Sequence, residues 1–330
     1  MGITIRDVAA AAGVSTATVS RALRGLPNVD EATRQRVREV ATHLDYVISP
    51  SASRLASGRT GSVAVITPAV SRWFFATVLS GVESVLQDAG VDLLLQSTAT
   101  SVISPARLRG RVDGVLAISV QPEDPQLQRV IELGLPTSLI GTWCDGAPSV
   151  MIDDIQAAGT ATRHLIDQGH QRIGVISGSV DGRPATPSHA RRTGFLEAMS
   201  AAGLEVGPQL EAHGQFTIDG GEQAMEQLLA SPTPPTAVFA MSDEMAFGAM
   251  RALRRHGLAP GQDVALVGID GHDMSEYLDL TTVAQPVVEL GRIAATWMLE
   301  QLADGPVRPP ESILVPTTLM IRGSSVRSRH

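Results

Sequence analysis

The chain has 330 residues and a formal net charge of -8 at pH 7, and all 26 of its basic side chains are arginines. No run of about 18 apolar residues occurs, so we expect no membrane-spanning helix. No apolar stretch precedes the first predicted helix, so we expect no secretory signal. The single cysteine, Cys144, cannot form an internal disulfide, which is typical of a reducing cytoplasm. Charge is also segregated: residues 1–60 hold eight arginines against five acidic residues, whereas residues 61–330 hold eighteen against twenty-nine. A basic segment on an acidic body favours contact with DNA phosphates through that segment.

Two short helices separated by a glycine are predicted at the N-terminus. Thr4 can cap the first helix, Asp7 suits its positive end, and Gly13 can take the left-handed conformation that ends it. Ser15 then caps a second helix, whose outward face carries small or hydrogen-bonding residues and one arginine: Thr16, Ala17, Thr18, Ser20 and Arg21. Such a face can approach base edges closely, as the recognition helix of a helix-turn-helix does. These twenty residues alone also fit a helical hairpin without a DNA role.

A third helix is predicted behind Asp30, with Val37, Val40 and Leu44 as its buried stripe. A fourth, shorter helix is predicted over residues 49–58, because Ser, Pro and Gly stand at its N-cap, first and terminal positions. A helix of fewer than three turns is marginal alone. We therefore expect it to fold against a partner, such as its own copy in a dimer or DNA.

After Gly61 the pattern changes to apolar strand-like runs that alternate with helical segments. The runs are VAVIT, VDLLLQ, GVLAIS, TSLIGT, RIGVISG, TAVFAMS and DVALVGID, with a helix predicted over residues 75–89. This alternation is typical of α/β folds with parallel sheets covered by helices. Ligands of such sheets bind at the carboxyl ends of the strands. The sequence thus divides into a small all-α helix-turn-helix headpiece (1–47), a hinge helix and linker (48–60) and an α/β core (61–330).

Seven motifs in this order resemble the lactose-repressor (LacI/GalR) family of bacterial transcription factors: TIRDVAAAAGVSTATVSRAL, DYV, RLASGRTGSVAVITP, HLIDQGHQRIGVISG, RRTGFLEAM, SDEMAFGAMRAL and DVALVGID. They cover essentially the whole chain, which is similar to actinobacterial regulators of the cellobiose or maltose type. The resemblance implies a core of two lobes joined by three crossings, like a periplasmic sugar-binding protein. It also implies a homodimer whose affinity for operator DNA is set by a small ligand, and no cofactor.

The resemblance assigns DNA contacts to the headpiece and the hinge. Thr16 and Ala17 match the pair that varies with operator sequence, and Arg21 suits either guanine reading or a phosphate grip. Leu55 matches a leucine that wedges into the minor groove, and Ala52 a small residue where two hinge helices pack. The family's usual Pro-Asn before the hinge helix is replaced by Ile-Ser at positions 48 and 49. Phosphate contacts are expected from Thr4, Ser15, Thr18 and Ser20.

Three consecutive aromatic residues, Trp73, Phe74 and Phe75, follow the first core strand in a chain with eleven aromatics in total. Aromatic faces stack on the apolar faces of sugar rings. The resemblance places the positions of Phe74 and Phe75 at the effector cleft, although one of the three rings also suits a core role. The triplet favours a di- or oligosaccharide.

Arg191 matches a family arginine that hydrogen-bonds the effector. Two departures affect the other family contacts: Gly271 stands where a second carboxylate is common, and Gly141 where some relatives carry an aspartate. The remaining candidates for effector binding lie in loops after predicted strands: Trp143, Ser242, Asp243, Asp270, His272 and Asp273. Trp143 equally suits a packing role, and Asp243 a capping role.

The resemblance implies a dimeric repressor that an effector releases from DNA. Co-repression by a non-sugar metabolite and a plain solute-binding protein are the alternatives. An enzyme is not expected, because the chain has no Gly-Lys phosphate loop, no histidines at metal-ligand spacing and no catalytic signature around its cysteine. Residues 97–111 are shorter than in relatives, so a reduced helix is expected there, further limited by Pro105. No heptad tail follows the core, so a dimer rather than a tetramer is expected.

Overall fold

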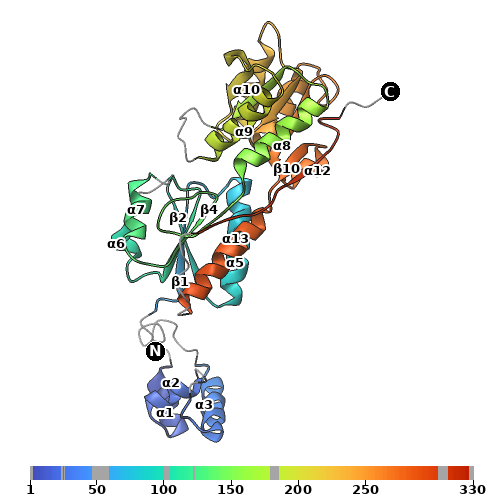
Figure 1. The fold of residues 1–330 in the computed structure, drawn as a ribbon. Coiled ribbons are helices and arrows are strands. Elements are labelled where there is room, and N and C mark those ends of the chain that lie inside the picture. The colour runs from blue at the N-terminus through green and yellow to red at the C-terminus, as the bar shows by residue number, and fades with distance from the viewer. Residues whose placement is uncertain are drawn as a thin grey trace. The chain divides into compact units, whose positions relative to one another are not determined.

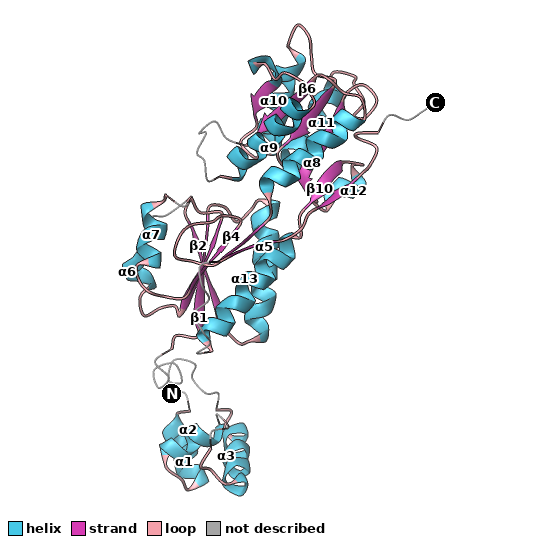
Figure 2. Ribbon diagram, in the orientation of Figure 1, coloured by secondary structure: helices cyan, strands magenta, loops and turns pink. Residues whose placement is uncertain are grey.

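A computed structural model describes residues 3–23, 25, 27–46, 59–99, 104–121, 123–178, 186–303 and 311–326. The chain divides into two compact units, Met1–Gly61 and Ser62–His330. Figures 1 and 2 show the elements of each unit, which are taken separately below.

The described residues of the first unit form three helices, α1 (Ile5–Ala12), α2 (Thr16–Leu23) and α3 (Glu31–His43). Gly13 has φ 66°, the left-handed conformation that ends α1. The helices share a small core of valines and alanines: Val8, Ala9, Ala12, Val19, Ala22, Val37 and Ala41. The three predicted helices are thus confirmed. The predicted hinge helix, with Ala52 and Leu55, lies outside the described residues.

The second unit begins with a lobe built on a six-stranded sheet of order β11-β5-β4-β3-β1-β2. Its strands are β1 (Ser62–Thr67), β2 (Asp92–Ser97), β3 (Gly114–Ile118), β4 (Thr137–Ile140), β5 (Ser149–Met151) and β11 (Ser312–Leu314). All neighbouring strands run parallel. One face is covered by α5 (Trp73–Asp88) and α13 (Val287–Leu302), the other by α6 (Pro105–Leu108) and α7 (Pro125–Ile131) (Figure 2). This is the first lobe.

The second lobe holds a six-stranded sheet of order β12-β10-β9-β8-β6-β7, parallel except for β12. Its strands are β6 (Ile173–Ser177), β7 (Glu211–His213), β8 (Ala237–Ala240), β9 (Ala265–Asp270), β10 (Thr281–Ala284) and β12 (Thr318–Met320). The helices are α8 (Asp154–Asp167), α9 (Pro187–Ala201), α10 (Ile218–Leu229), α11 (Asp243–Arg255) and the short α12 (Met274–Tyr277), with a 3-10 turn, η1 (Pro208–Leu210), before β7. A single apolar core joins these elements.

The chain passes between the lobes three times, from β5 to α8, from β10 to α13 and from β11 to β12. The predicted two-lobed α/β core is therefore confirmed. The short strands β5, β7, β10, β11 and β12 are absent from the sequence prediction, because runs of three or four residues carry little pattern. The expected reduced helix is the four-residue α6, and Pro105 stands in its first turn rather than shortening it from within.

Helices α5 and α13 approach each other through glycines. A Cβ atom on Gly81 would lie 2.1 Å from the carbonyl oxygen of Val288, and one on Gly291 would lie 2.3 Å from that of Val78. The two backbones thus touch where a side chain would separate them, so α5 and α13 form one rigid layer. Among the helices of the described ranges, none is long and apolar enough to cross a membrane.

Candidate functional site

The outward face of α2 carries the residues predicted to meet DNA. Thr16, Ala17 and Arg21 are exposed, whereas Thr18 and Ser20 are half-buried. The face is free of bulky side chains other than Arg21, which suits close approach to base edges.

Three of the predicted phosphate contacts take part in capping. The backbone N–H and the hydroxyl of Thr4 donate to Asp7 Oδ2, at 2.8 and 2.7 Å. These bonds hold the pKa of the Asp7 carboxyl below its usual value. Ser15 Oγ accepts from the backbone N–H of Thr18 at 3.1 Å and is hydrogen-bonded to the Thr18 hydroxyl at 2.9 Å. These groups therefore stabilise the starts of α1 and α2, and this role does not depend on contact with DNA.

A cavity of about 400 Å³ lies between the two lobes of the core. Its wall includes residues that directly follow or end strands of both sheets, such as Ser119 after β3 and Gln285 after β10. Three phenylalanine rings give it apolar surface: Phe74, Phe75 and Phe216. Its charged lining consists of four carboxyl groups and two guanidinium groups: Asp124, Asp154, Glu244, Asp270, Arg72 and Arg191.

Arg191, on α9, is the centre of the polar wall. Its Nε donates to Asp154 Oδ1 at 2.7 Å, its Nη1 donates to the carbonyl of Met241, and Nη1 lies 3.7 Å from Asp270 Oδ1. Burial alone would lower the pKa of Arg191, but Asp154 and Asp270 outweigh it and raise that pKa. The guanidinium is thus charged and fixed in direction before any ligand enters.

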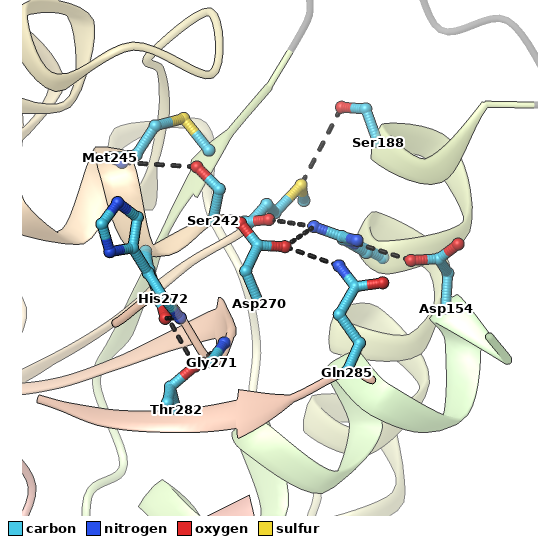
Figure 3. A network of polar contacts seen from close by, with 12 residues as sticks. Asp154, Ser188, Ser242, Met245, Asp270, Gly271, His272, Thr282 and Gln285 are labelled. Carbon is cyan, nitrogen blue, oxygen red and sulfur yellow. Dashed lines mark hydrogen bonds and ion pairs between the residues drawn. The ribbon is translucent and has the colours of Figure 1, made fainter. Parts of the chain in front are cut away.

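Asp270 ends β9 with φ 137°, an uncommon backbone conformation. Its Oδ1 accepts from Gln285 Nε2 at 2.7 Å. Burial raises the pKa of Asp270 to about 7, against the opposing effect of Arg191. Figure 3 shows Asp154, Asp270 and Gln285 converging on one point. This cluster can accept from and donate to hydroxyl groups, which is what recognition of a polyol requires.

Asp243 is fully buried and is engaged by the protein itself. Its Oδ1 accepts from the Thr282 hydroxyl at 2.7 Å, and its Oδ2 accepts from the Ser275 hydroxyl and the backbone N–H of His272, both at 2.8 Å. A Cβ atom on Gly268 would lie 2.1 Å from Asp243 Oδ1, so the glycine makes room for the carboxylate. Asp243 therefore joins α11 to β10 and to the loop before α12.

Five of the ten residues predicted to bind an effector line the cavity: Phe74, Phe75, Arg191, Ser242 and Asp270. The other five do not: Trp73, Trp143, Asp243, His272 and Asp273. Trp143 is 48% exposed, outside the wall. The Trp73 ring lies against His272 instead, with ring centroids 4.7 Å apart. Consecutive helical residues point about 100° apart, so the three neighbouring aromatics cannot all face one cavity.

Sequence reasoning missed several residues of the wall. Asp154 follows β5 and Gln285 follows β10, two short strands that the pattern did not predict. Phe216, at φ 55°, follows β7 in the same way. A cavity residue of this kind can be predicted from its position after a strand. That position is apparent in the sequence only where the strand itself is predicted. Among the described residues, no three His, Cys, Asp or Glu side chains are grouped to hold a metal ion.

A helix-turn-helix unit in one chain with a two-lobed core that encloses a cavity defines a class of ligand-regulated DNA-binding proteins. Residues 4–49 match the model of the bacterial regulatory proteins of the lacI family, and residues 162–325 match a periplasmic binding protein-like domain. The chain is 35% identical to the HTH-type transcriptional repressor CytR of Escherichia coli (strain K12), covering 98% of this chain and 96% of the relative. It is 36% identical to the HTH-type transcriptional regulator CelR of Thermobifida fusca, covering 97% and 98%. The chain belongs to the lacI family of bacterial regulatory proteins.

Solved structures agree with this assignment. The complex of the transcriptional regulator CelR with cellobiose matches with a TM-score of 0.72 and 34% identity, over 98% of this chain and 99% of that one. The Lac repressor dimer bound to operator and an anti-inducer matches with a TM-score of 0.87 over 99% and 100%, and at 24% identity this likeness concerns the fold.

Proposed function

We propose that this protein is a homodimeric, cytoplasmic transcriptional repressor that binds operator DNA through α2 and is released by a neutral carbohydrate. The observation that carries the proposal is the cavity between the lobes, where phenylalanine rings face a fixed cluster of Arg191, Asp154 and Asp270. Rings that stack on sugar faces and polar groups that bind hydroxyls together suit a saccharide. The relative solved with cellobiose supports the same ligand class. No catalytic role is proposed.

The charge of the cavity argues for an uncharged effector. Its four carboxyl groups outnumber its two guanidinium groups, and two of those carboxyl groups, on Asp154 and Asp270, lie beside Arg191. A phosphorylated sugar would bring negative charge next to these carboxyl groups. Residues proposed to contact the effector are Phe74, Phe75, Asp154, Arg191, Phe216, Ser242, Asp270 and Gln285. Residues proposed to contact DNA bases are Thr16, Ala17 and Arg21.

The effector acts through its different affinity for two arrangements of the protein. A ligand that binds one arrangement of the lobes more tightly shifts the population toward it, and by linkage it changes operator affinity by the same factor. The disaccharide class is preferred because aromatic rings on both lobes, Phe74 and Phe216, give two apolar surfaces.

The test is a titration of cellobiose, maltose and glucose against the complex of the protein with promoter DNA from upstream of its own gene. Release by one disaccharide at micromolar concentration is expected. Phe74→Ala should abolish release without weakening DNA binding, and Leu95→Ala, an exposed residue outside the cavity wall, is the matched control. Tightening in place of release would mean co-repression. If none of the three sugars changes DNA binding, the carbohydrate assignment is wrong and the DNA-binding assignment stands.

A further inference from the structure

The N-terminus of α5 is held by the opposite lobe. The N-cap residue, Arg72, makes no side-chain hydrogen bond to the helix. Burial raises the pKa of the Glu244 carboxyl group, in the first turn of α11, and the nearby backbone N–H of Trp73 opposes this rise. N–H groups at a helix start favour a carboxylate close by, which also interacts with the helix dipole. An acidic residue of the second lobe thus lies at the start of a helix of the first.

The Trp73 side chain makes a hydrogen bond across the same boundary. Its Nε1 donates to Asp273 Oδ2 at 3.0 Å, and its ring stacks on His272 with centroids 4.7 Å apart and planes at 24°. Both partners belong to the loop before α12. The residues Trp73, Glu244, His272 and Asp273 are called the interlobe clasp below.

The second-lobe side of the clasp is rigid. The His272 backbone N–H donates to the buried Asp243, and His272 Nδ1 accepts from the Met274 N–H at 2.9 Å. The Phe247 ring meets the His272 ring edge-on at 5.0 Å. The imidazole is therefore a fixed platform, and Trp73 is the group that docks on it.

The clasp adjoins the cavity, which its members Trp73, His272 and Asp273 do not line. Glu244 lines the cavity, and so do Phe74 and Phe75, the next residues after Trp73 on α5. The first-lobe side is rigid as well, since the glycines of α5 and α13 lock those helices together. A change in the angle between the lobes must therefore either carry the clasp along or break it.

We propose that Trp73 is a positioning residue, which docks on His272 and Asp273 to hold the lobes closed over the cavity before an effector arrives. It sets how much of the free protein is in the arrangement that binds the effector, and so sets the effector concentration at which DNA is released. The second statement rests on the proposed function, whereas the first concerns the ligand-free protein and does not. The apparent affinity for a ligand is higher when the arrangement that binds it is already populated.

The first test measures the distance between the lobes without any ligand. In a Cys144→Ser background, spin labels are placed at Gln87→Cys on α5 and at Gln168→Cys after α8, both exposed. Labelled chains are diluted with unlabelled ones, so that each measured pair lies within one chain. The distribution of distances between the two labels is measured by double electron–electron resonance. Trp73→Ala should broaden this distribution or shift it to longer distances, and Leu95→Ala should leave it unchanged. A Trp73→Ala distribution that superimposes on the parent overturns the proposal.

Milder variants separate the clasp from general damage. Trp73→Phe keeps a stacking ring but removes the indole N–H, and Asp273→Ala removes the acceptor, whose carboxylate makes no cap bond to α12. Because each removes the same hydrogen bond, the double variant should open the lobes no further than either single one. Glu276→Ala, which removes an exposed carboxylate from α12, is the control for Asp273→Ala. If Trp73→Phe and Asp273→Ala instead open the lobes additively, the two residues do not act through the same hydrogen bond, and the proposal is contradicted.

The second readout is cellobiose affinity measured by calorimetry on the full chain. Loss of a hydrogen bond and a stacked ring is worth about one factor of ten in an equilibrium constant. Trp73→Ala is therefore expected to weaken cellobiose binding roughly tenfold. If none of cellobiose, maltose and glucose binds the parent protein, the carbohydrate part of the proposed function fails, and the distance measurement still tests whether Trp73 holds the lobes together. If Trp73→Ala changes cellobiose affinity but not the lobe distance, Trp73 is a ligand contact and the clasp is wrong.

Discussion

Arg191 is surrounded by groups that need its charge. Asp270 is buried beside it and the Asp154 side chain is only 14% exposed, so its removal leaves two carboxyl groups in a low-dielectric site without a countercharge. Arg191→Leu is expected to lower the free energy of unfolding by about 3–5 kcal/mol, measured by urea denaturation. Adding Asp154→Asn should restore part of this loss. The neighbouring Arg192, whose side chain is 46% exposed in its ion pair with Glu211, should cost less than about 1 kcal/mol when changed to Leu. Equal losses for the two arginines would contradict the buried cluster.

Asp270 predicts a pH dependence of stability. Its pKa is raised from 3.8 to about 7, mainly by burial. Between these values the folded protein holds a proton that the unfolded chain has lost, so the free energy of unfolding falls as pH rises through this window. The contribution is roughly 1.4 kcal/mol for each pH unit crossed, and it is fully present only below the lower value. Asp270→Asn should flatten this part of the profile, measured by urea denaturation at several pH values. Asp88→Asn, at an exposed position, should leave the profile as it is.

Single residues also show where sequence reasoning stops. Arg191 was predicted at the cavity because it lies in the motif RRTGFLEAM, and Phe74 because it belongs to an aromatic triplet at a position that the resemblance places there. Trp73 was predicted beside Phe74, but helical phase turns it toward His272. Asp243 was recognised as a residue after a strand, yet its three acceptor bonds come from groups 29 to 39 residues away, which no local pattern reveals.

At the scale of elements, the contact between α5 and α13 depends on the absence of two side chains. Gly81→Ala would place a methyl group against the Val288 carbonyl, so the helices must separate. We expect a loss of about 1–3 kcal/mol in the free energy of unfolding, measured by urea denaturation, together with weaker effector binding, because α5 carries Phe74 and Phe75. Gly159→Ala is the matched control, since on α8 the new methyl meets the movable end of the Arg163 side chain. A stable Gly81→Ala protein with unchanged effector affinity would contradict the rigid layer.

The sequence predicted the long, buried elements and missed the short ones. The long buried strands β1, β3 and β9 appear as continuous apolar runs, and the helices α1 to α3 start after the capping residues Thr4, Ser15 and Asp30. Strands β5, β10, β11 and β12 have three or four residues and are positioned by their neighbours in the sheets. The chain crosses between the lobes directly after β5, β10 and β11. The sequence pattern therefore predicted an α/β core without its crossings, and the three crossings were predicted from the family resemblance.

The whole molecule combines a basic headpiece with an acidic core, and its two binding events should respond differently to salt. If a dimer neutralises six to ten phosphates, operator affinity should fall by about 10³ to 10⁵ between 50 and 200 mM salt. Binding of an uncharged sugar releases no such counterions, so its affinity should change by less than about twofold over the same range. Fluorescence anisotropy with labelled operator and calorimetry with cellobiose measure the two on the same preparation. Equal salt slopes would contradict either the phosphate contacts or the neutral effector.

The three crossings between the lobes also bear on the order in which the protein can fold on the ribosome. Strands β1 to β5 leave the ribosome early, but α13 and β11, which complete their lobe, follow only after the whole run from α8 to β10 has been made. Until then the face of α5 that receives α13 is bare, with apolar side chains such as Val78 and Val82 open to water. The second lobe can thus assemble its core apart from the edge strand β12 before the first lobe receives α13, although synthesis of the first lobe begins first. A nascent chain stalled just before residue 287 would expose this unfinished face, which makes it the stage of biosynthesis most in need of a chaperone.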